Sequence, residues 1–437
     1  MSKPVEERAR LAWLMGLTNA TYGLAYAVVL VTVPQLLAAR GAAEPAIASL
    51  TALALTASMA TFAVAPILDT LVSRRAWSIA LALALSGLTF LVLRMPTGSA
   101  MFAPVLAIDA LTISLFNASM GGWLGAALPK SSDETIGTWF AIGNAAGFGL
   151  GAVCQYWLVS HLPVGLGAAV VAGLTLIPLA ILPLIPAPDA DRRAVHESFA
   201  NLRRDVLQLV HQPLVLRIIL MFVLPCAAFT LTNAFGGIGR DFHASDSMVD
   251  VANGVGATLI GFFASLGARL LLKWVPAPLM YLGVGSLGAA FTLSLLALPR
   301  TPATYVLAVL GENAAQSLAQ VAQNTIVFRS IRRGSPLASS QFGVLSTAFL
   351  VPYVYMQMLD GHGYKLAGNM SGSFLMDGSV SLAACALLAG PVLRWLRAGK
   401  LETASTDASI QVVPTGGSGS LSTRAAGSEK AFTSQSR

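Results

Sequence analysis

Charged side chains are scarce in this sequence. Asp, Glu, Lys and Arg make up 11% of its 437 residues, whereas a soluble domain carries about 25%. Hydrophobic residues account for 55%, and the mean hydropathy is +0.70. Such a composition excludes an ordinary soluble enzyme and predicts a chain that crosses a membrane many times.

Cysteine and histidine are also few. The three cysteines, Cys154, Cys226 and Cys385, lie in apolar runs, and their odd number and spacing fit neither a disulfide framework nor a zinc site. The five histidines are scattered, with no pair at ligand spacing. No Ser–His arrangement or paired loop carboxylates suggest catalysis. We therefore predict no metal site, no cofactor and no enzymatic activity.

The net charge of +7 and a pI near 9.5 would suit a nucleic-acid partner. The basic residues, however, sit in short loops between apolar runs, where they set the orientation of membrane helices. We therefore expect the lipid bilayer, and not nucleic acid, to be the partner that this charge serves.

Apolar runs of about 20 residues, separated by charge, proline and glycine, predict an all-α, polytopic membrane protein. The first run is too long for a signal peptide and lacks a cleavage site, so it counts as a helix. Twelve membrane helices are expected, six plus six, over residues 11–37, 45–68, 76–94, 101–128, 136–160, 164–186, 214–236, 248–272, 278–298, 302–328, 337–360 and 374–397.

The 27 Lys and Arg residues are distributed unevenly between alternate loops. With both termini in the cytoplasm, only Arg40, Arg94, Arg240, Arg300 and Lys365 fall outside. Positive residues prefer the cytoplasmic side, so we expect a multi-pass inner (cytoplasmic) membrane protein with both termini cytoplasmic.

Four regions follow from these patterns. Residues 1–188 form an N-terminal six-helix half, and residues 214–400 form a C-terminal one. Between them, residues 189–213 carry apolar side chains at helical spacing opposite arginines, which predicts a cytoplasmic linker with an amphipathic helix on the membrane surface, or else a solvated linker. Residues 401–437 are rich in Ser, Thr, Gly and Ala and predict a disordered tail.

The expected helix over 302–328 carries a stripe of polar side chains. At about 100° per residue these fall within one arc of the helix, and the arc consists of Glu312, Gln316, Gln320 and Gln323, flanked by Asn313 and Asn324. Polar groups in a bilayer face protein or water. The stripe therefore indicates a pathway for substrate or protons, with polar contacts between helices as the alternative, although a buried carboxylate favours the pathway.

An internal repeat relates the two halves. A shift of about 203 residues maps Asp109 onto Glu312 and Asn117 onto Gln320. Transporters built from repeats bind substrate at the repeat interface near the midplane, so we expect these pairs to face one another there. Asn19 and Tyr22 follow helical spacing in the first helix and either line the same cavity or join helices.

The loop after the second helix carries Asp69, Arg74 and Arg75. A charge-assisted network among these residues would clamp the inner side of the membrane and open when the halves rock. The alternative is that both arginines serve orientation alone, which leaves Asp69 unexplained.

The chain resembles the major facilitator superfamily, and within it the AmpG-type muropeptide permeases of the peptide and acetyl-CoA transporter group. The residues that carry the resemblance are Pro66–Asp69, Trp123, Leu128–Pro129, Glu312–Asn313 and Ser339–Ser346. The muropeptide permeases tend to carry acidic residues where this chain has Asn117, Gly121 and Ala126.

The resemblance implies a monomeric secondary transporter that moves a polar solute by alternating access, through proton-coupled import. A muropeptide-like, acyl-carrier or siderophore-like solute fits this expectation. The alternatives are an efflux transporter of the same fold and a transporter-like membrane sensor.

Overall fold

The structure, a computed structural model, describes residues 11–42, 44–186, 204, 206–235 and 238–399. Within these residues every regular element is a helix, which confirms the predicted all-α class. Ten helical segments of this part of the chain are long and apolar enough to cross a membrane. Helix α16 is also long enough but carries the polar stripe, and the apolar helix α12 is shorter, so twelve segments in all correspond to the expected helices.

Six helical segments precede residue 187. The first is divided by short 3-10 and π turns, and the last continues from α10 into a 3-10 segment. In order they are α2 (Ala12–Gly16), α3 (Ala20–Ala27) and α4 (Val33–Ala39); α5 (Glu44–Met59), α6 (Thr61–Val64) and η3 (Ala65–Asp69); α7 (Arg74–Arg94); α8 (Phe102–Ala127); α9 (Asp133–His161); and α10 (Val164–Leu174) with η5 (Ile177–Leu184).

The second group follows the predicted linker, most of which lies outside the described residues; residues 206–211 are helical. Its elements are α12 (Pro213–Val223), η6 (Thr230–Asn233) and η8 (Gly239–Phe242); α13 (Asp246–Val251) with α14 (Ala257–Leu271); α15 (Ala277–Ser294); α16 (Pro302–Ser330); α17 (Ala338–Ala367); and α18 (Met370–Arg397). The predicted tail, 401–437, lies outside the described part of the chain.

One expected helix is wrong in its second half. The sequence predicts a single helix over 214–236, but α12 ends at Val223. Pro225 has no amide proton and forces the residue before it out of the helical region, so Leu224 is extended with ψ 143°. Phe229 then adopts a left-handed conformation, φ 50°, before η6 begins. The segment 224–229, called here the α12 break, is irregular.

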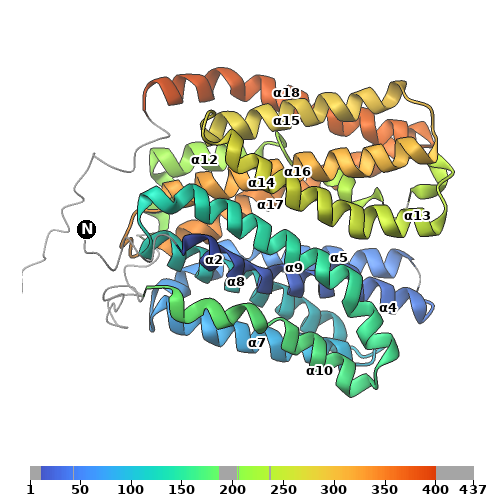
Figure 1. Cartoon of the computed structure of the whole chain (residues 1–437), viewed down its shortest axis with the longest axis horizontal. Coiled ribbons are helices and arrows are strands. Elements are labelled where there is room, and N and C mark those ends of the chain that lie inside the picture. The colour runs from blue at the N-terminus through green and yellow to red at the C-terminus, as the bar shows by residue number, and fades with distance from the viewer. Residues whose placement is uncertain (1–10, 43, 187–203, 205, 236–237, 400–437) are drawn as a thin grey trace, which may run out of the picture. The chain divides into compact units, whose positions relative to one another are not determined.

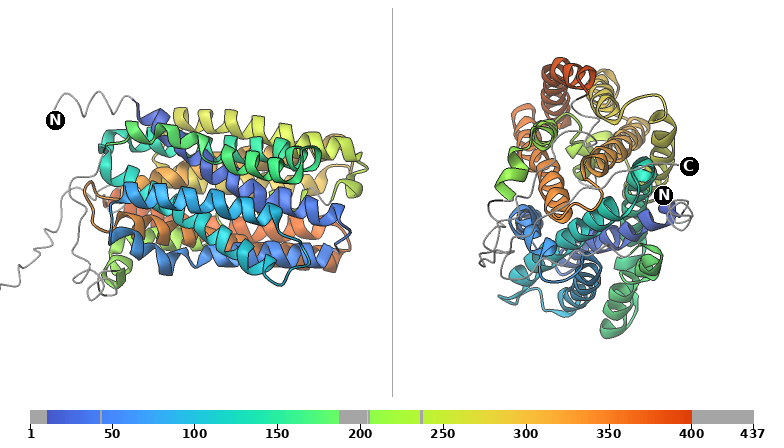
Figure 2. Two further views of the ribbon diagram at one scale, coloured as in Figure 1. Left: turned by 90° about the horizontal axis from the view of Figure 1, so that it is seen from below. Right: turned by 90° about the vertical axis from the view of Figure 1, so that its left-hand side faces the viewer.

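The helices form two packed groups. In Figures 1 and 2 the helices α2 to α10 lie on one side of the bundle and α12 to α18 on the other. The groups meet where α9 packs against α14 and α16, and where α8 packs against α17. A glycine makes the second contact close, because a Cβ on Gly122 of α8 would lie 2.6 Å from the backbone of Ser339 in α17.

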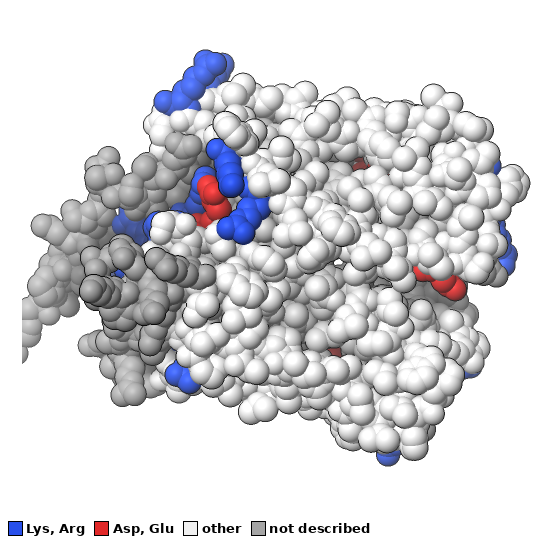
Figure 3. Space-filling view, in the orientation of Figure 1, with Lys and Arg blue, Asp and Glu red and all other residues white. Residues whose placement is uncertain are grey.

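Most of the charge on the face shown in Figure 3 lies towards the ends of the bundle. Lys and Arg gather there towards the two ends of the helices, and the belt between them is almost entirely uncharged. Large apolar side chains such as Phe62, Leu83 and Phe263 are more than half exposed. A bilayer covers such a surface, since exposed apolar area of this extent is costly in water.

Candidate functional site

Glu312 lies in the interior of α16 with no exposed surface. Helix α16 starts at Pro302, and the Thr301 hydroxyl accepts from the Thr304 amide to cap it. One Glu312 carboxyl oxygen contacts the Thr292 hydroxyl of α15. The other oxygen has no hydrogen-bond partner within the described residues. A carboxyl group so poorly paired is costly to keep charged.

The Thr292 hydroxyl donates to the Gly288 carbonyl oxygen at 3.0 Å and also lies against Glu312. A hydroxyl has one proton, so it can donate to only one of these two acceptors. The hydroxyl is therefore placed to donate either to the Gly288 carbonyl oxygen or to the Glu312 carboxyl group.

Two further carboxylates lie near Glu312. Asp360 of α17 and Asp377 of α18 are both buried and close enough to Glu312 to repel it electrostatically. One Asp360 oxygen accepts from the Thr230 hydroxyl at 2.6 Å, and the other has no partner in the described chain. Asp377 receives only a long contact, 3.4 Å, from the Ser381 hydroxyl. None of the ion pairs described includes these three acids.

The sequence analysis did not single out Asp360 or Asp377. Asp377 stands alone in an apolar helix, whereas Asp360 is the last residue of the expected span 337–360, with a single amide, Gln357, three residues before it. The signal that would have found them is the same one used for Glu312, an ionisable residue inside a membrane span.

The amides of the stripe do not share the surroundings of Glu312. Gln316 is half-buried and donates to the Tyr353 hydroxyl of α17 at 3.2 Å, whereas Asn313 donates to the Val309 carbonyl oxygen of its own helix. Gln320 is half-buried and makes no hydrogen bond within the described residues, and Gln323 is buried. Of these amides, Gln320 is the one that is half-buried and has no hydrogen-bond partner among the described residues.

Asp109 of α8 is fully buried, and neither of its oxygens has a hydrogen-bond partner among the described residues. Thr89 of α7 lies beside it. The shift of 203 residues that maps Asp109 onto Glu312 also maps Thr89 onto Thr292. Each half therefore holds an acid beside a threonine. Among the described residues, the polar neighbours given for each acid belong to its own half.

Three other predicted site residues, Asn19, Tyr22 and Asn117, lie in the first group of helices. Asn19 is buried and donates to the Phe140 carbonyl oxygen of α9 at 3.0 Å. Tyr22 is half-buried and packs against Tyr26, with ring centroids 4.7 Å apart. Asn117 of α8 is half-buried, with its side-chain oxygen buried and unpartnered in the described chain.

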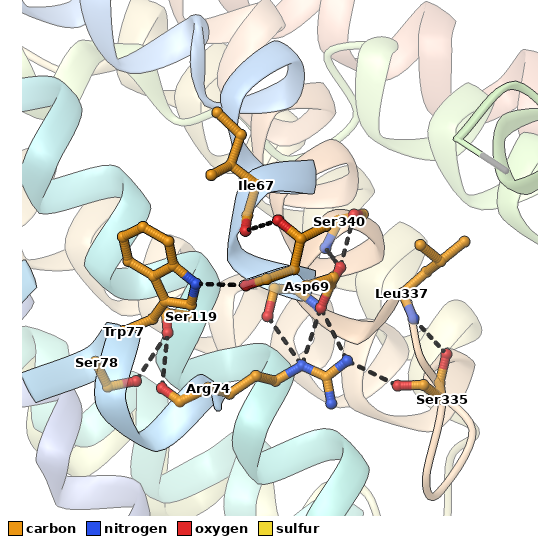
Figure 4. A network of polar contacts seen from close by, with 11 residues as sticks. Ile67, Asp69, Arg74, Trp77, Ser78, Ser119, Ser335, Leu337 and Ser340 are labelled. Atoms are coloured by element: carbon orange, nitrogen blue, oxygen red, sulfur yellow. Dashed lines mark hydrogen bonds and ion pairs between the residues drawn. The ribbon is translucent and has the colours of Figure 1, made fainter. Parts of the chain in front are cut away.

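Asp69 joins the two groups at one end of the bundle, called here the Asp69 end. Its carboxylate accepts from Arg74 at 2.8 and 2.9 Å, from the Ser339 and Ser340 amides at 3.1 and 2.7 Å, and from the Ser340 hydroxyl at 2.6 Å (Figure 4). These amides belong to the N-terminus of α17, whose partial positive charge favours an anion. Arg74 also donates to the Ser335 carbonyl oxygen at 2.8 Å.

The two arginines of this loop differ. Arg74 is 2% exposed and forms the buried ion pair with Asp69. Arg75 is exposed and lies outside this network. The residues expected to act together therefore separate into a buried pair, Asp69 and Arg74, and a surface charge.

A second contact at the Asp69 end was missed by the sequence analysis. The Lys130 ammonium group donates to the carbonyl oxygens of Phe328, at 3.0 Å, Arg329, at 3.2 Å, and Ile331. These are the last carbonyls of α16, where a cation is favourable. Glu134 forms an ion pair with Arg329 beside them. Asp69 thus holds the start of α17, and Lys130 holds the end of α16.

Aromatic side chains pack between these two contacts. Phe140 of α9 lies against Phe328 of α16 and Phe342 of α17, with ring centroids 5.3 and 5.7 Å away. All three side chains are buried. The two groups of helices are therefore joined at the Asp69 end by an apolar layer as well as by the polar contacts.

The fold and these contacts define a polytopic helical membrane transporter, with acids buried inside the bundle and helix termini that link its two groups. The chain belongs to the Major Facilitator Superfamily, whose family model matches residues 15–355. No curated protein matches the sequence.

Solved structures of this fold cover most of the chain. The proton:xylose symporter XylE bound to 6-bromo-6-deoxy-D-glucose is 16% identical with a TM-score of 0.59, over 88% of this chain and 95% of that one. A XylE variant with two introduced tryptophans is 14% identical, TM-score 0.61, over 89% and 96%. The human organic anion transporter MFSD10 (TETRAN) is 16% identical, TM-score 0.59, over 89% and 100%. At these identities the likeness shows a shared fold.

Proposed function

We propose that this protein imports a polar solute across the inner membrane by alternating access and couples the import to protons, with Glu312 as the proton carrier. The observation that carries the proposal is the burial of Glu312, with one oxygen against Thr292 and the other unpartnered in the described chain. The likeness of the fold to a proton:xylose symporter supports it.

In this mechanism the Asp69 end is the inner gate. While Asp69 holds the N-terminus of α17 and Lys130 holds the C-terminus of α16, the two halves stay together on the cytoplasmic side. The proton on Glu312 neutralises an otherwise unpaired charge inside the bundle. When the halves rock and the gate opens, water reaches the carboxyl group and takes the proton, which ties one proton to each cycle.

The solute is proposed to bind between the halves, on side chains that have hydrogen-bonding capacity left over. Gln316 and Gln320 of α16 and Asn117 of α8 are half-buried, and Gln320 makes no hydrogen bond in the described chain. Amides of this kind both donate and accept, which suits a solute rich in hydroxyl and amide groups. A muropeptide-like, acyl-carrier or siderophore-like compound has this chemistry.

The same proposal includes two six-helix halves, residues 1–188 and 214–400, working as one monomer with both termini in the cytoplasm. The uneven loop charge supports the orientation. In this orientation Asp69 and Lys130 are on the cytoplasmic side. Glu312 is then about 15 Å from the outer end of α16, because it follows Pro302 by ten residues and an α-helix rises about 1.5 Å per residue.

Uptake into proteoliposomes tests this function. The purified protein is reconstituted, and labelled muropeptide, siderophore and acyl-carrier compounds are offered with and without an inward proton gradient. We expect one class to accumulate, and only when the gradient is present. Equal uptake with and without the gradient would contradict proton coupling. Movement of labelled solute out of the vesicles in response to the proton gradient would show efflux instead.

A further inference from the structure

The three buried acids of the second group lie at different depths below the outer surface, in the orientation proposed above. Asp360 is seven residues before Ala367, where α17 ends. Asp377 is seven residues after Met370, where α18 begins. At about 1.5 Å per residue, both lie about 10 Å from the outer ends of their helices, whereas Glu312 lies about 15 Å deep. The exposed fraction falls from 6% in Asp360 to 3% in Asp377 and 0% in Glu312, so burial increases in that order.

A row of polar side chains on α18 reaches the first of these acids. Ser373, Asp377 and Ser381 recur every four residues and therefore lie on one face of the helix. The Ser373 hydroxyl donates to the Asp360 carbonyl oxygen of α17 at 2.8 Å. The Ser381 hydroxyl donates to the Asp377 carboxylate over a longer distance, 3.4 Å. Asp377 is thus one helical turn further in than the contact between α18 and Asp360.

On its other side α18 packs along α15 (Figure 1), and a glycine makes this contact close. A Cβ on Gly378, the residue after Asp377, would lie 3.0 Å from the Ala289 carbonyl oxygen of α15. Ala289 is about one turn before Thr292, whose hydroxyl contacts Glu312. The packing of α18 therefore brings the level of Asp377 close to the pair formed by Thr292 and Glu312.

Electrostatic repulsion gives the order of the three acids. Asp377 repels the Glu312 carboxylate more strongly than Asp360 does. Asp377 also repels the Asp360 carboxylate. Because such repulsion weakens with distance, Asp377 is the middle member of a series that runs from Asp360 to Glu312.

The surroundings of this series supply no cation to balance it. The ion pairs of the described residues include none of the three acids. Arg300 lies at the same outer end, but its guanidinium donates to the Asn369 side-chain oxygen and the Ser371 hydroxyl at 2.6 Å each. His362, two residues after Asp360, is exposed. Neighbouring carboxyl groups that lack a cation hold protons among themselves, because they cannot all ionise at close range.

Two carboxyl oxygens of the series have no hydrogen-bond partner among the described residues, and they belong to its two ends. Asp360 accepts from the Thr230 hydroxyl at Oδ2, at 2.6 Å, and leaves Oδ1 unpartnered. Glu312 places Oε1 against Thr292 and leaves Oε2 unpartnered. A buried oxygen without a partner is unfavourable. The series therefore begins and ends at an oxygen that gains from taking up a proton.

We propose that Asp360 and Asp377 form a proton path that loads Glu312 from the outer side. The inference rests on the proposed function and names the residues that supply its proton carrier. A hydronium ion protonates Asp360 at Oδ1 and leaves water behind. The proton then moves to Asp377 and on to Glu312 Oε2, and each aspartate returns to its earlier charge. Each step crosses a water molecule, since no hydrogen bond joins the three acids in the described chain.

A pH jump followed by time-resolved infrared spectroscopy tests the path with protons as the only ligand. Full-length protein in detergent is acidified by a light-released acid, and the bands of protonated carboxyl groups are recorded as they appear. The band missing from Glu312→Gln identifies Glu312. We expect this band to appear about a hundredfold more slowly in Asp360→Asn and in Asp377→Asn, the lower end of the contribution of a positioned proton-transfer group.

Three comparisons separate proton transfer from packing. Asp360→Glu keeps the acid and should restore most of the rate. Azide, a small diffusible weak acid, should restore the rate in Asp360→Asn, because it carries protons to a buried site and repairs no packing defect. Asp250→Asn is the matched control, since it removes an exposed acid of α13, and Glu312 should gain its proton there at the parental rate.

Parental rates in Asp360→Asn or Asp377→Asn would overturn the path, and so would slow protonation that neither azide nor Asp360→Glu restores. If one aspartate variant fails to fold, the other decides the question alone. The two proposals fail in different ways. A parent spectrum without any band that Glu312→Gln removes would show that the proton carrier itself is wrong. A Glu312 band that appears at the parental rate in both aspartate variants would overturn the path alone.

Discussion

At the scale of single residues, the molecule pairs a buried acid with a threonine in each half. Glu312 lies against Thr292, and Asp109 lies beside Thr89, 203 positions earlier in both cases. The surroundings then differ. Glu312 has Asp360 and Asp377 nearby, whereas no second acid approaches Asp109 in the described chain. We therefore propose that the Glu312–Thr292 pair couples transport to protons, whereas the Asp109–Thr89 pair only packs helices together.

Replacing the two threonines separates these roles. Thr292→Val removes the hydroxyl that contacts Glu312 and keeps the shape of the side chain. We expect gradient-driven accumulation to fall about fivefold, the effect of one hydrogen bond of about 1 kcal/mol. Thr89→Val is the matched control and should transport nearly as the parent does. Equal losses in both variants would indicate packing defects instead.

The residues of the site were predictable to different degrees. Glu312 could be found because amides at helical spacing surround it, and Asp69 because it stands in a loop of basic residues. Lys130 could not be found, since its partners are backbone carbonyls of α16, 198 or more positions away, which leave no mark in the side-chain pattern. The expectation that Asp109 and Glu312 face one another stays a prediction, and the polar neighbour that the structure gives each acid belongs to its own half.

At the scale of the elements, the Asp69 end joins helix termini from the two halves. The buried Asp69–Arg74 pair caps α17, and Lys130 caps α16. Breaking a buried ion pair costs about 3–5 kcal/mol, because it leaves one charge unpaired. This end of the bundle is therefore the part of the contact between halves that is most sensitive to a single substitution.

Adjacent arginines give a sharp test of the gate. Arg74→Gln and Arg75→Gln each remove one positive charge from the same loop, so both change the orientation signal equally. We expect uptake to fall about tenfold or more in Arg74→Gln, and in Asp69→Asn, while membrane insertion is retained. Arg75→Gln should resemble the parent. Equal uptake by the two arginine variants would indicate that both arginines only set the orientation of the protein in the membrane.

Helix positions could largely be predicted from apolar runs. The expected spans 76–94 and 302–328 agree with α7 and α16 to within two residues at each end. The largest difference is in the span 214–236, where apolar residues continue through the α12 break. In addition, α17 continues to Ala367, seven residues beyond the expected end at 360. Hydropathy records whether a segment suits a bilayer and is insensitive to backbone conformation, so Pro225 was the only signal of the interruption.

At the scale of the whole molecule, the residues up to 399 that the structure describes contain the packed core and every contact discussed above. Residues 401–437 are rich in Ser, Thr, Gly and Ala, a composition unable to build a core of its own. We predict that a chain ending at residue 400 inserts and transports at the parental rate. The check is uptake per reconstituted protein, and a truncated chain that folds yet transports poorly would assign the tail a role.

The most direct test of the account is Glu312→Gln, assayed for two activities in the same proteoliposomes. Gradient-driven accumulation needs the proton, whereas exchange of solute across the bilayer needs only alternating access. Asp250→Asn, a change at an exposed acid of α13, is the control. We predict that Glu312→Gln loses accumulation and keeps exchange. Accumulation at the parental level would contradict the account and leave Glu312 as a polar contact between helices, and loss of both activities would make it a binding residue.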